Sequence, residues 1–255
     1  MNSAYERIEQ ERSFRDMHIP FGEELSNDFP PSFNRFELES VLQLVGCGSA
    51  SLKSLLDVGC ADCRVSENPF VAKGVQRYVG LDHALGVLRS VSARKNAPCI
   101  VAGSMLEIPF ADNSFDGVIA IQSLMHVPGD DLRRQAVREF YRVLVPGGRL
   151  VLTVITPRRW RKYLGSILHS DSDVVEGFFR NSTLPVSLHR GGELIESLVN
   201  VGFHVTHVRS SHVLPAWLHR FAPGMAILIE GGWCRVFGAR MRQAGWYLQI
   251  AAVKS

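Results

Sequence analysis

The sequence lacks a cysteine framework and long apolar runs. Its five cysteines are an odd number and are scattered along the 255 residues, which excludes the spacing of a disulfide-rich secreted domain. No apolar run approaches the ~18 residues that a membrane-spanning helix needs. The first residues are polar and mixed in charge, unlike a signal peptide or a transit peptide. These absences predict a cytoplasmic protein.

An excess of one charge is also missing. The chain has 28 Lys and Arg against 25 Asp and Glu, and its net charge of +3 is by itself too small to indicate nucleic-acid binding. Hydrophobic residues make up 46% of the chain and charged residues 21%, as in ordinary globular proteins. The chain is long enough to bury a sizeable core, in one large domain or two small ones.

Strand and helix signals alternate between residues 52 and 155. Short apolar runs predict strands near residues 54–58, 77–81, 99–102, 117–121 and 149–155. Helical periodicity marks residues 85–95 and 130–144, whereas Pro69 and Gly74 interrupt the linker between the first two strands. This alternation predicts an α/β protein with a parallel sheet covered by helices on both faces.

The two ends of the chain differ from this central region. Charged residues at 3–17 and an apolar face at 35–44 predict two helices before the first strand. After residue 155 we expect an irregular stretch at 156–190, a helix at 192–200 and strands at 203–209 and 245–253.

A turn that follows an acid and a glycine is the most informative feature. The apolar run from Leu55 ends in Asp57 and Gly59, which predicts a buried strand and a tight turn where backbone can approach a ligand. A second apolar run ends in Asp82, roughly 25 residues later. This is near the ~20-residue offset at which nucleotide-binding units place a carboxylate on the ribose hydroxyls.

Several segments occur in the order of a known family. Residues 55–60, 79–82 and 103–118 resemble, in turn, the first motif, the second motif and the joined third and fourth motifs of class I S-adenosylmethionine-dependent methyltransferases. Residues 144–150 resemble the turn before that family's fifth strand. The resemblance implies a Rossmann-like, seven-stranded, mostly parallel sheet with helices on both faces and an antiparallel last strand.

The resemblance also implies a division of the chain. Residues 1–50 would form an N-terminal helical cap, and residues 51–255 would form the methyltransferase domain. The loop at 123–127 and the variable stretches 156–190 and 211–244 would join the N-terminal segment in building the acceptor side, because such loops carry specificity.

The family's cofactor, S-adenosyl-L-methionine, is expected beyond the carboxyl ends of the strands. Gly59 would let backbone approach the methionyl part, Asp57 would attract the ammonium group, and Asp82 would accept hydrogen bonds from both ribose hydroxyls. Gln122 would face the amino-acid end of the cofactor. The other expected cofactor-binding residues are Cys60, Ala61 and His83, and, around the adenine, Ser104, Met105 and Leu106.

The sequence departs from the family pattern at three positions. Of the usual Gly-x-Gly-x-Gly, only Gly59 remains. Ala61 adds a methyl group where backbone should touch the ligand, and Cys63 is larger and does not easily take a positive φ. Ser104 stands where Asp is more frequent, and a hydroxyl binds the adenine amino group more weakly than a carboxylate does. These departures are compatible with small backbone shifts or with a fold that has lost its cofactor.

Other chemistry-bearing residues have simpler structural interpretations. Cys60 and Cys63 form a C-x-x-C without a second pair of zinc ligands, so we expect buried thiols and no metal. His126 is a candidate catalytic base, or a loop histidine that packs or caps. The basic and aromatic cluster at 158–163 suits an anionic substrate, RNA or a solvated loop. The apolar segment at 213–238 suits a membrane interface or, preferably, two helices at the sheet edge.

The sequence therefore predicts an enzyme that transfers a methyl group from S-adenosylmethionine to a small molecule by in-line displacement. A strong base is needed only where the acceptor is a hydroxyl or an acidic carbon. The alternatives are a catalytically inactive partner or regulatory protein and an RNA methyltransferase. A nicotinamide-dependent oxidoreductase is disfavoured, because residues 59–63 lack the G-x-G-x-x-G spacing.

Overall fold

Helices and strands alternate along the computed structural model, which describes residues 2–18, 31–48, 52–155, 174–179, 182–187, 191–211, 221–222, 224–226, 228–229 and 247–255. Its elements are α1 (Asn2–His18), α2 (Pro31–Val45), β1 (Ser54–Val58), α3 (Pro69–Gly74), β2 (Arg77–Asp82), α4 (Leu85–Ser92), β3 (Cys99–Ala102), β4 (Phe115–Ile121), η1 (Leu124–His126), α5 (Asp130–Val143), β5 (Leu144–Ile155), β6 (Val174–Phe179), β7 (Ser182–Ser187), α7 (Gly191–Val201), β8 (Phe203–Ser211) and β9 (Tyr247–Lys254).

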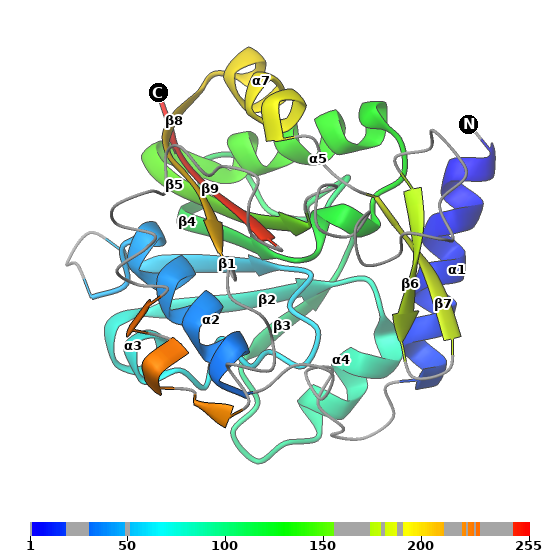
Figure 1. Cartoon of the computed structure of the whole chain (residues 1–255), viewed down its shortest axis with the longest axis horizontal. Helices are drawn as coiled ribbons and strands as arrows, with labels where there is room; N and C mark the ends of the chain where they lie inside the picture. Colours follow the sequence, from blue (N-terminus) through cyan, green and yellow to red (C-terminus); the bar gives the residue numbers. More distant parts are fainter. Residues whose placement is uncertain are drawn as a thin grey trace.

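Seven of the described strands form one sheet in the order β3-β2-β1-β4-β5-β9-β8 (Figure 1). Strands β1 to β5 pair in parallel, and β9 runs antiparallel to both of its neighbours, β5 and β8. The predicted sheet with its antiparallel last strand is therefore confirmed. The register places Asp57 beside Gly80 and Asp82 beside Ala102, so the carboxyl ends of the parallel strands share one edge.

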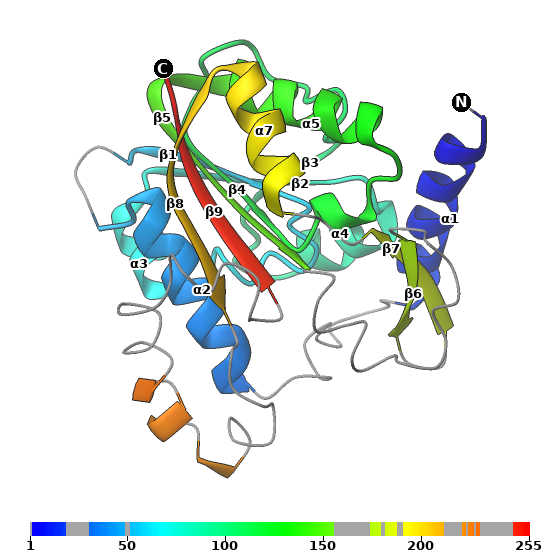
Figure 2. The same cartoon turned by 45° about the horizontal axis from the view of Figure 1, so that its top comes forward.

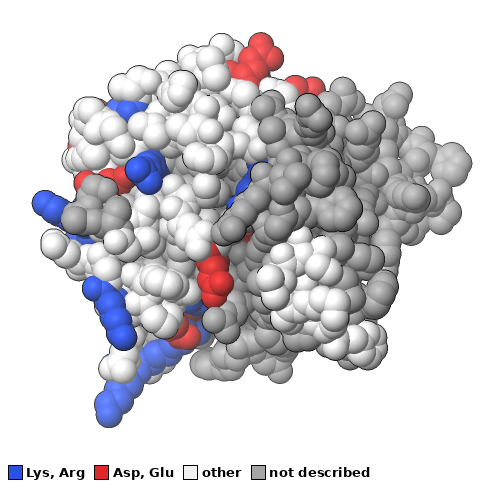
Figure 3. Space-filling view, turned by 60° about the vertical axis from the view of Figure 1, so that its left-hand side comes forward, with Lys and Arg blue, Asp and Glu red and all other residues white. Residues whose placement is uncertain are grey.

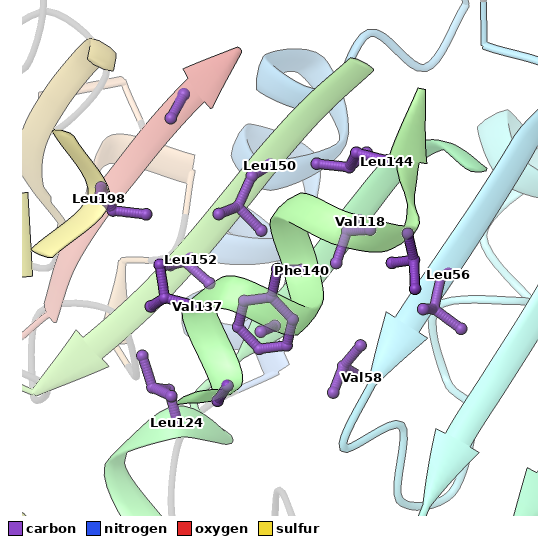
Figure 4. Packing of buried hydrophobic residues seen from close by; sticks show 14 of the residues in the cluster. Leu56, Val58, Val118, Leu124, Val137, Phe140, Leu144, Leu150, Leu152 and Leu198 are labelled. Carbon is purple, nitrogen blue, oxygen red and sulfur yellow. The ribbon is translucent and has the colours of Figure 1, made fainter. Parts of the chain in front are cut away.

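Buried side chains fill both faces of this sheet. On one face, Phe140 of α5 and Leu198 of α7 pack on residues of the central strands such as Val118, and Figure 4 shows the ring of Phe140 over these strands. On the other face, Val41 of α2 packs against Leu55 of β1. Helices cover both faces because apolar side chains of the strands point to both sides of a parallel sheet.

A short helix occupies the linker that the sequence pattern left open. Helix α3 begins at Pro69, and the side chain of Asn68 accepts a hydrogen bond from the Phe70 N–H at 3.0 Å. Proline suits the first helical position because it needs no amide hydrogen there. The proline that interrupts the sequence pattern therefore starts a helix.

The expectation of an irregular stretch at 156–190 is wrong for part of that stretch. Strands β6 and β7 pair antiparallel, and we call them the β6–β7 ribbon. Pro185 and Gly177 lie within these strands, and both residues weaken a strand pattern. Figures 1 and 2 show the ribbon beside α1, and β7 also contacts η1. The 158–163 cluster and most of 213–238 lie outside the described residues.

Among the described residues, no helix combines the length and the apolar character needed to cross a bilayer.

An arginine of α5 holds the loop between β3 and β4. The guanidinium of Arg142 donates hydrogen bonds to the carbonyl oxygens of Ile108 and Phe110, both at 2.8 Å, and to Asp112 at 2.9 Å. Glu139 accepts from Arg142 at 2.8 Å and from the Ile108 N–H at 2.7 Å. The bond from Arg142 lowers the pKa of Glu139, so this carboxylate stays charged. The loop is thus fixed at several backbone groups.

We expect Arg142→Ala to lower the free energy of unfolding by about 1.5–3 kcal/mol, the range for hydrogen bonds that involve charged groups. Arg138→Ala is the matched control, because Arg138 lies exposed on the same helix. Urea denaturation of both variants measures the difference. Equal losses of stability in the two variants would contradict the role given to Arg142.

Candidate cofactor and active site

The turn after β1 keeps a left-handed backbone at three alternate residues. Gly59, Ala61 and Cys63 have φ angles of +74°, +47° and +58°. The expectation that Cys63 resists a positive φ is therefore wrong. A non-glycine residue in this region costs roughly 1–2 kcal/mol, so the surrounding structure must hold the turn in place.

The two thiols of the turn point into the protein interior. Cys60 and Cys63 are buried free cysteines that pack with Leu88 and Val91 of α4. They occupy the space above Gly80 of β2, where an added Cβ would lie 2.8 and 2.9 Å from the two sulfur atoms. Because the side chain of Cys63 fills this space, its bulk does not obstruct the ligand side of the turn.

The environment of these cysteines keeps the Cys60 thiol neutral. The hydrogen bond with Cys63 and burial raise the pKa of the Cys60 thiol far above its ordinary value. The described residues contain no group of three or more His, Cys, Asp or Glu side chains that could hold a metal ion. The expected buried thiols are thus observed, and the Cys60 thiol stays protonated.

Asp82 connects the turn after β1 with the turn after β2. One carboxylate oxygen accepts the Ala61 N–H and the other accepts the Ala84 N–H, both at 2.9 Å. The side chain is buried, and each oxygen keeps a second lone pair. Asp82 can therefore bind a ribose hydroxyl with each oxygen while it holds the backbone on both sides.

Asp57 lies in a different environment. Its carboxyl group is buried and accepts a hydrogen bond from the Tyr78 hydroxyl at 2.7 Å. Burial raises the pKa of Asp57 to about 7, against the opposing effects of Tyr78 and of the positive charge of Arg64. A cationic ligand group would favour the ionised form. Sequence reasoning missed Tyr78, because its role depends on pairing between β1 and β2.

The loop after β4 lies directly against Gly59. An added Cβ at Gly59 would lie 2.4 Å from the Cβ of Ser123, and the Ser123 hydroxyl donates to the Val58 carbonyl oxygen at 2.8 Å. Glycine is thus required at this position both by its positive φ and by this close contact. Ser123 is a second residue that the sequence motifs did not single out.

The residues expected around the adenine follow β3. The Ser104 hydroxyl oxygen accepts the Leu106 N–H at 3.1 Å, which leaves its hydrogen available for donation. Leu106 is buried, and Met105 packs against the main core as a partly buried side chain. The structure thus gives this segment one orientable hydroxyl and two apolar side chains.

Gln122 directly follows β4, and helix α2 holds its side chain. Its φ is +53°, and its side-chain amide donates to Glu37 of α2 at 2.6 Å. Its backbone N–H reaches the Thr153 hydroxyl at 3.0 Å. Burial raises the pKa of Glu37. The Gln122 amide hydrogens are therefore directed toward α2, and its side-chain oxygen is the group that can face a ligand.

His83 and His126 approach the same carboxylate. Glu11 of α1 has one oxygen 2.9 Å from His83 Nε2 and the other 3.9 Å from His126 Nδ1. Glu11 and the His126 side chain are buried. His83 follows Asp82 directly, so this cluster lies beside the expected ribose position.

The residues present fit the requirements of a methionine-linked nucleoside. The turn has a left-handed backbone at all three positions although only Gly59 is a glycine, its thiols point inward, and a buried carboxylate stands at the end of the next strand. This combination supplies close backbone approach, hydroxyl acceptors and a carboxyl group for a cation.

Comparisons of the whole chain with known proteins lead to methyltransferases. A family model described as a methyltransferase domain matches residues 56–152. A protein of Encephalitozoon cuniculi described as a candidate methyltransferase is 30% identical over 155 residues, which cover 59% of this chain and 70% of that protein. The demethylmenaquinone methyltransferase of Renibacterium salmoninarum is 35% identical over 105 residues, 41% of this chain and 42% of that enzyme.

The fold is also similar to a solved structure with a bound nucleoside. The N-methyltransferase NodS from Bradyrhizobium japonicum, in complex with S-adenosyl-L-homocysteine, superposes with a TM-score of 0.56 at 15% identity. The superposition covers 90% of this chain and 90% of NodS. At this identity the likeness concerns the fold.

We expect Gly80→Ala to destabilise the protein by about 1–3 kcal/mol, because the new methyl group meets both thiols. The same substitution in a Cys60→Ala, Cys63→Ala background should cost less. Gly192→Ala is the control, since a Cβ there meets nothing within 4 Å. Urea denaturation of these variants gives the coupling free energy between position 80 and the two cysteines. An undiminished cost in the cysteine-free background would show that the thiols do not fill this space.

Proposed function

Because the chain belongs to the class I S-adenosylmethionine-dependent methyltransferases, we propose that it transfers a methyl group to a small-molecule acceptor by in-line displacement. The cofactor supplies an electrophilic methyl group bound to a sulfonium sulfur. The observation that carries the proposal is the left-handed turn after β1, bonded through the Ala61 N–H to Asp82.

Several residues of this chain would hold the cofactor. Asp82 would bind the ribose hydroxyls, and the backbone at Gly59 and Ala61 would lie against the methionyl part. The Asp57 carboxylate would attract the ammonium group, directly or through water. The segment after β3, with the Ser104 hydroxyl, would flank the adenine. These roles need no metal ion.

The charge distribution favours a small acceptor over RNA. Net charge is only +3, and on the face drawn in Figure 3 the described Lys and Arg side chains lie at separate places among uncharged and acidic side chains. Nucleic-acid binding draws on clustered positive charge. The Renibacterium relative is named for demethylmenaquinone, a small molecule, which also supports this choice.

The retained turn also weighs against a cofactor-free partner protein. That alternative was motivated by Ala61 and Cys63, where glycines are expected. Both residues adopt the left-handed backbone, and the Cys63 side chain packs inward. The left-handed backbone is therefore present at both positions without a glycine.

We expect S-adenosylhomocysteine to bind the wild-type protein and Asp82→Asn to weaken binding about ten- to a hundredfold, since charge-assisted hydrogen bonds to the ribose are lost. Isothermal titration calorimetry measures both affinities. Asp131→Asn is the matched control, because Asp131 lies exposed on α5. Absence of heat and of a thermal shift at millimolar ligand in the wild type would contradict the proposal and favour the partner protein.

We expect binding of S-adenosylhomocysteine to tighten as the pH rises through about 7, because Asp57 then ionises and attracts the ligand's ammonium group. Without ligand, the effect of pH on the stability of the protein has the opposite sign. The pKa of Asp57 is raised above its unfolded value, so its contribution to stability falls as the pH rises from about 4 to about 7. Asp57→Asn should remove both dependences, as measured by calorimetry and urea denaturation. A wild-type pH profile identical to that of the variant would contradict this assignment.

A further inference from the structure

Helix α1 is attached to the site through two of its carboxylates. Asp16 accepts the Gly86 N–H at 2.6 Å, in the first turn of α4. The residue before α4, Ala84, provides no side-chain cap of its own. Asp16 therefore serves as a cap supplied by another helix, and it docks α1 beside the turn after β2.

Glu11 is the unusual residue of this helix. Its neighbours Glu9 and Gln10 are exposed, whereas Glu11 is buried and keeps only 3% of its full solvent exposure. Burial of a carboxylate is costly unless the charge is paired. Two imidazoles from different loops lie close to this carboxylate, His83 at 2.9 Å and His126 at 3.9 Å. Glu11 thus brings a buried carboxylate close to both histidines.

The two histidines present different nitrogens to this carboxylate. His83 faces it with Nε2, whereas His126 faces it with Nδ1. A carboxylate beside Nδ1 favours the tautomer with the hydrogen on that nitrogen, and the lone pair then resides on Nε2. The separation of 3.9 Å exceeds a hydrogen bond, and such bonds are often long before ligands bind.

We propose that Glu11 is a positioning residue that holds His126 in the Nδ1–H tautomer, so that Nε2 accepts a proton from the methyl acceptor. The proposal rests on the proposed methyl transfer and narrows its acceptor class to hydroxyl groups or acidic carbons, because these must lose a proton. A neutral amine needs no such base at the moment of attack.

The reaction balances with this proton acceptor. The acceptor's hydroxyl proton moves to His126 Nε2, and an electron pair of its oxygen forms the new bond to the methyl carbon. The electron pair of the broken carbon–sulfur bond stays on sulfur. The imidazolium formed is stabilised by the Glu11 carboxylate beside Nδ1, and it later returns its proton to solvent.

The test is the tautomer of His126, measured by long-range ¹⁵N–¹H NMR on the full chain at about pH 8, above the ordinary imidazole pKa. The resonances are assigned by their loss in His126→Asn. Spectra are recorded with and without S-adenosylhomocysteine. The wild type should show the hydrogen on Nδ1, and Glu11→Gln should lose this preference, whereas Glu11→Asp should keep part of it. A hydrogen on Nε2 in the wild type, or an unchanged preference in Glu11→Gln, would overturn the proposal.

Two control variants separate positioning from helix docking. Glu9→Gln makes the same substitution at an exposed residue of α1. Asp16→Asn weakens the attachment of α1 and leaves Glu11 in place. Both should retain the wild-type tautomer, and loss of the preference in Asp16→Asn as large as in Glu11→Gln would reduce Glu11 to a docking residue. Failure of S-adenosylhomocysteine to bind would refute the proposed function separately, since the tautomer is read without ligand.

Discussion

The carboxylate of Asp82 joins two turns that follow neighbouring parallel strands. By accepting the Ala61 N–H and the Ala84 N–H, it fixes the backbone that would approach the ligand relative to the carboxylate that would bind its sugar. The turn can remain left-handed because Gly80, on the strand below, leaves room for its thiols. The Ser123 loop then closes against Gly59. The geometry of the cofactor site thus depends on a single buried aspartate and its two amide partners.

The two aspartates of the site have different electrostatic tasks. Asp82 is surrounded by amide donors that suit a permanent hydrogen-bond acceptor. Asp57 is buried beside the Tyr78 hydroxyl, and burial raises its pKa to about 7, so its charge depends on what binds next to it. A cofactor that carries both a ribose and an ammonium group would use this difference. The methyl acceptor would instead be served by the loop after β4 and by α1, where Glu11 meets His126.

The parts of the fold that were predictable are those specified by local patterns. The central strands and the positions of Asp57 and Asp82 follow from short apolar runs, and the seven-stranded sheet with its inserted last strand follows from the family resemblance. The contacts that complete the site join residues far apart in the chain. The Cys63 side chain fits inside because a glycine lies on the adjacent strand. Glu11 meets His83 although 72 positions separate them in the sequence. Such contacts leave no periodic signal, so the sequence alone could not place them.

The most direct test of this account is a crystal structure of the protein with S-adenosylhomocysteine. We expect the nucleoside to lie against residues 59–63, with positive φ at Ala61 and Cys63 and with both ribose hydroxyls on the Asp82 carboxylate. The account would be contradicted by a ligand bound elsewhere, by negative φ angles at these two residues, or by an Asp82 side chain turned away from the sugar.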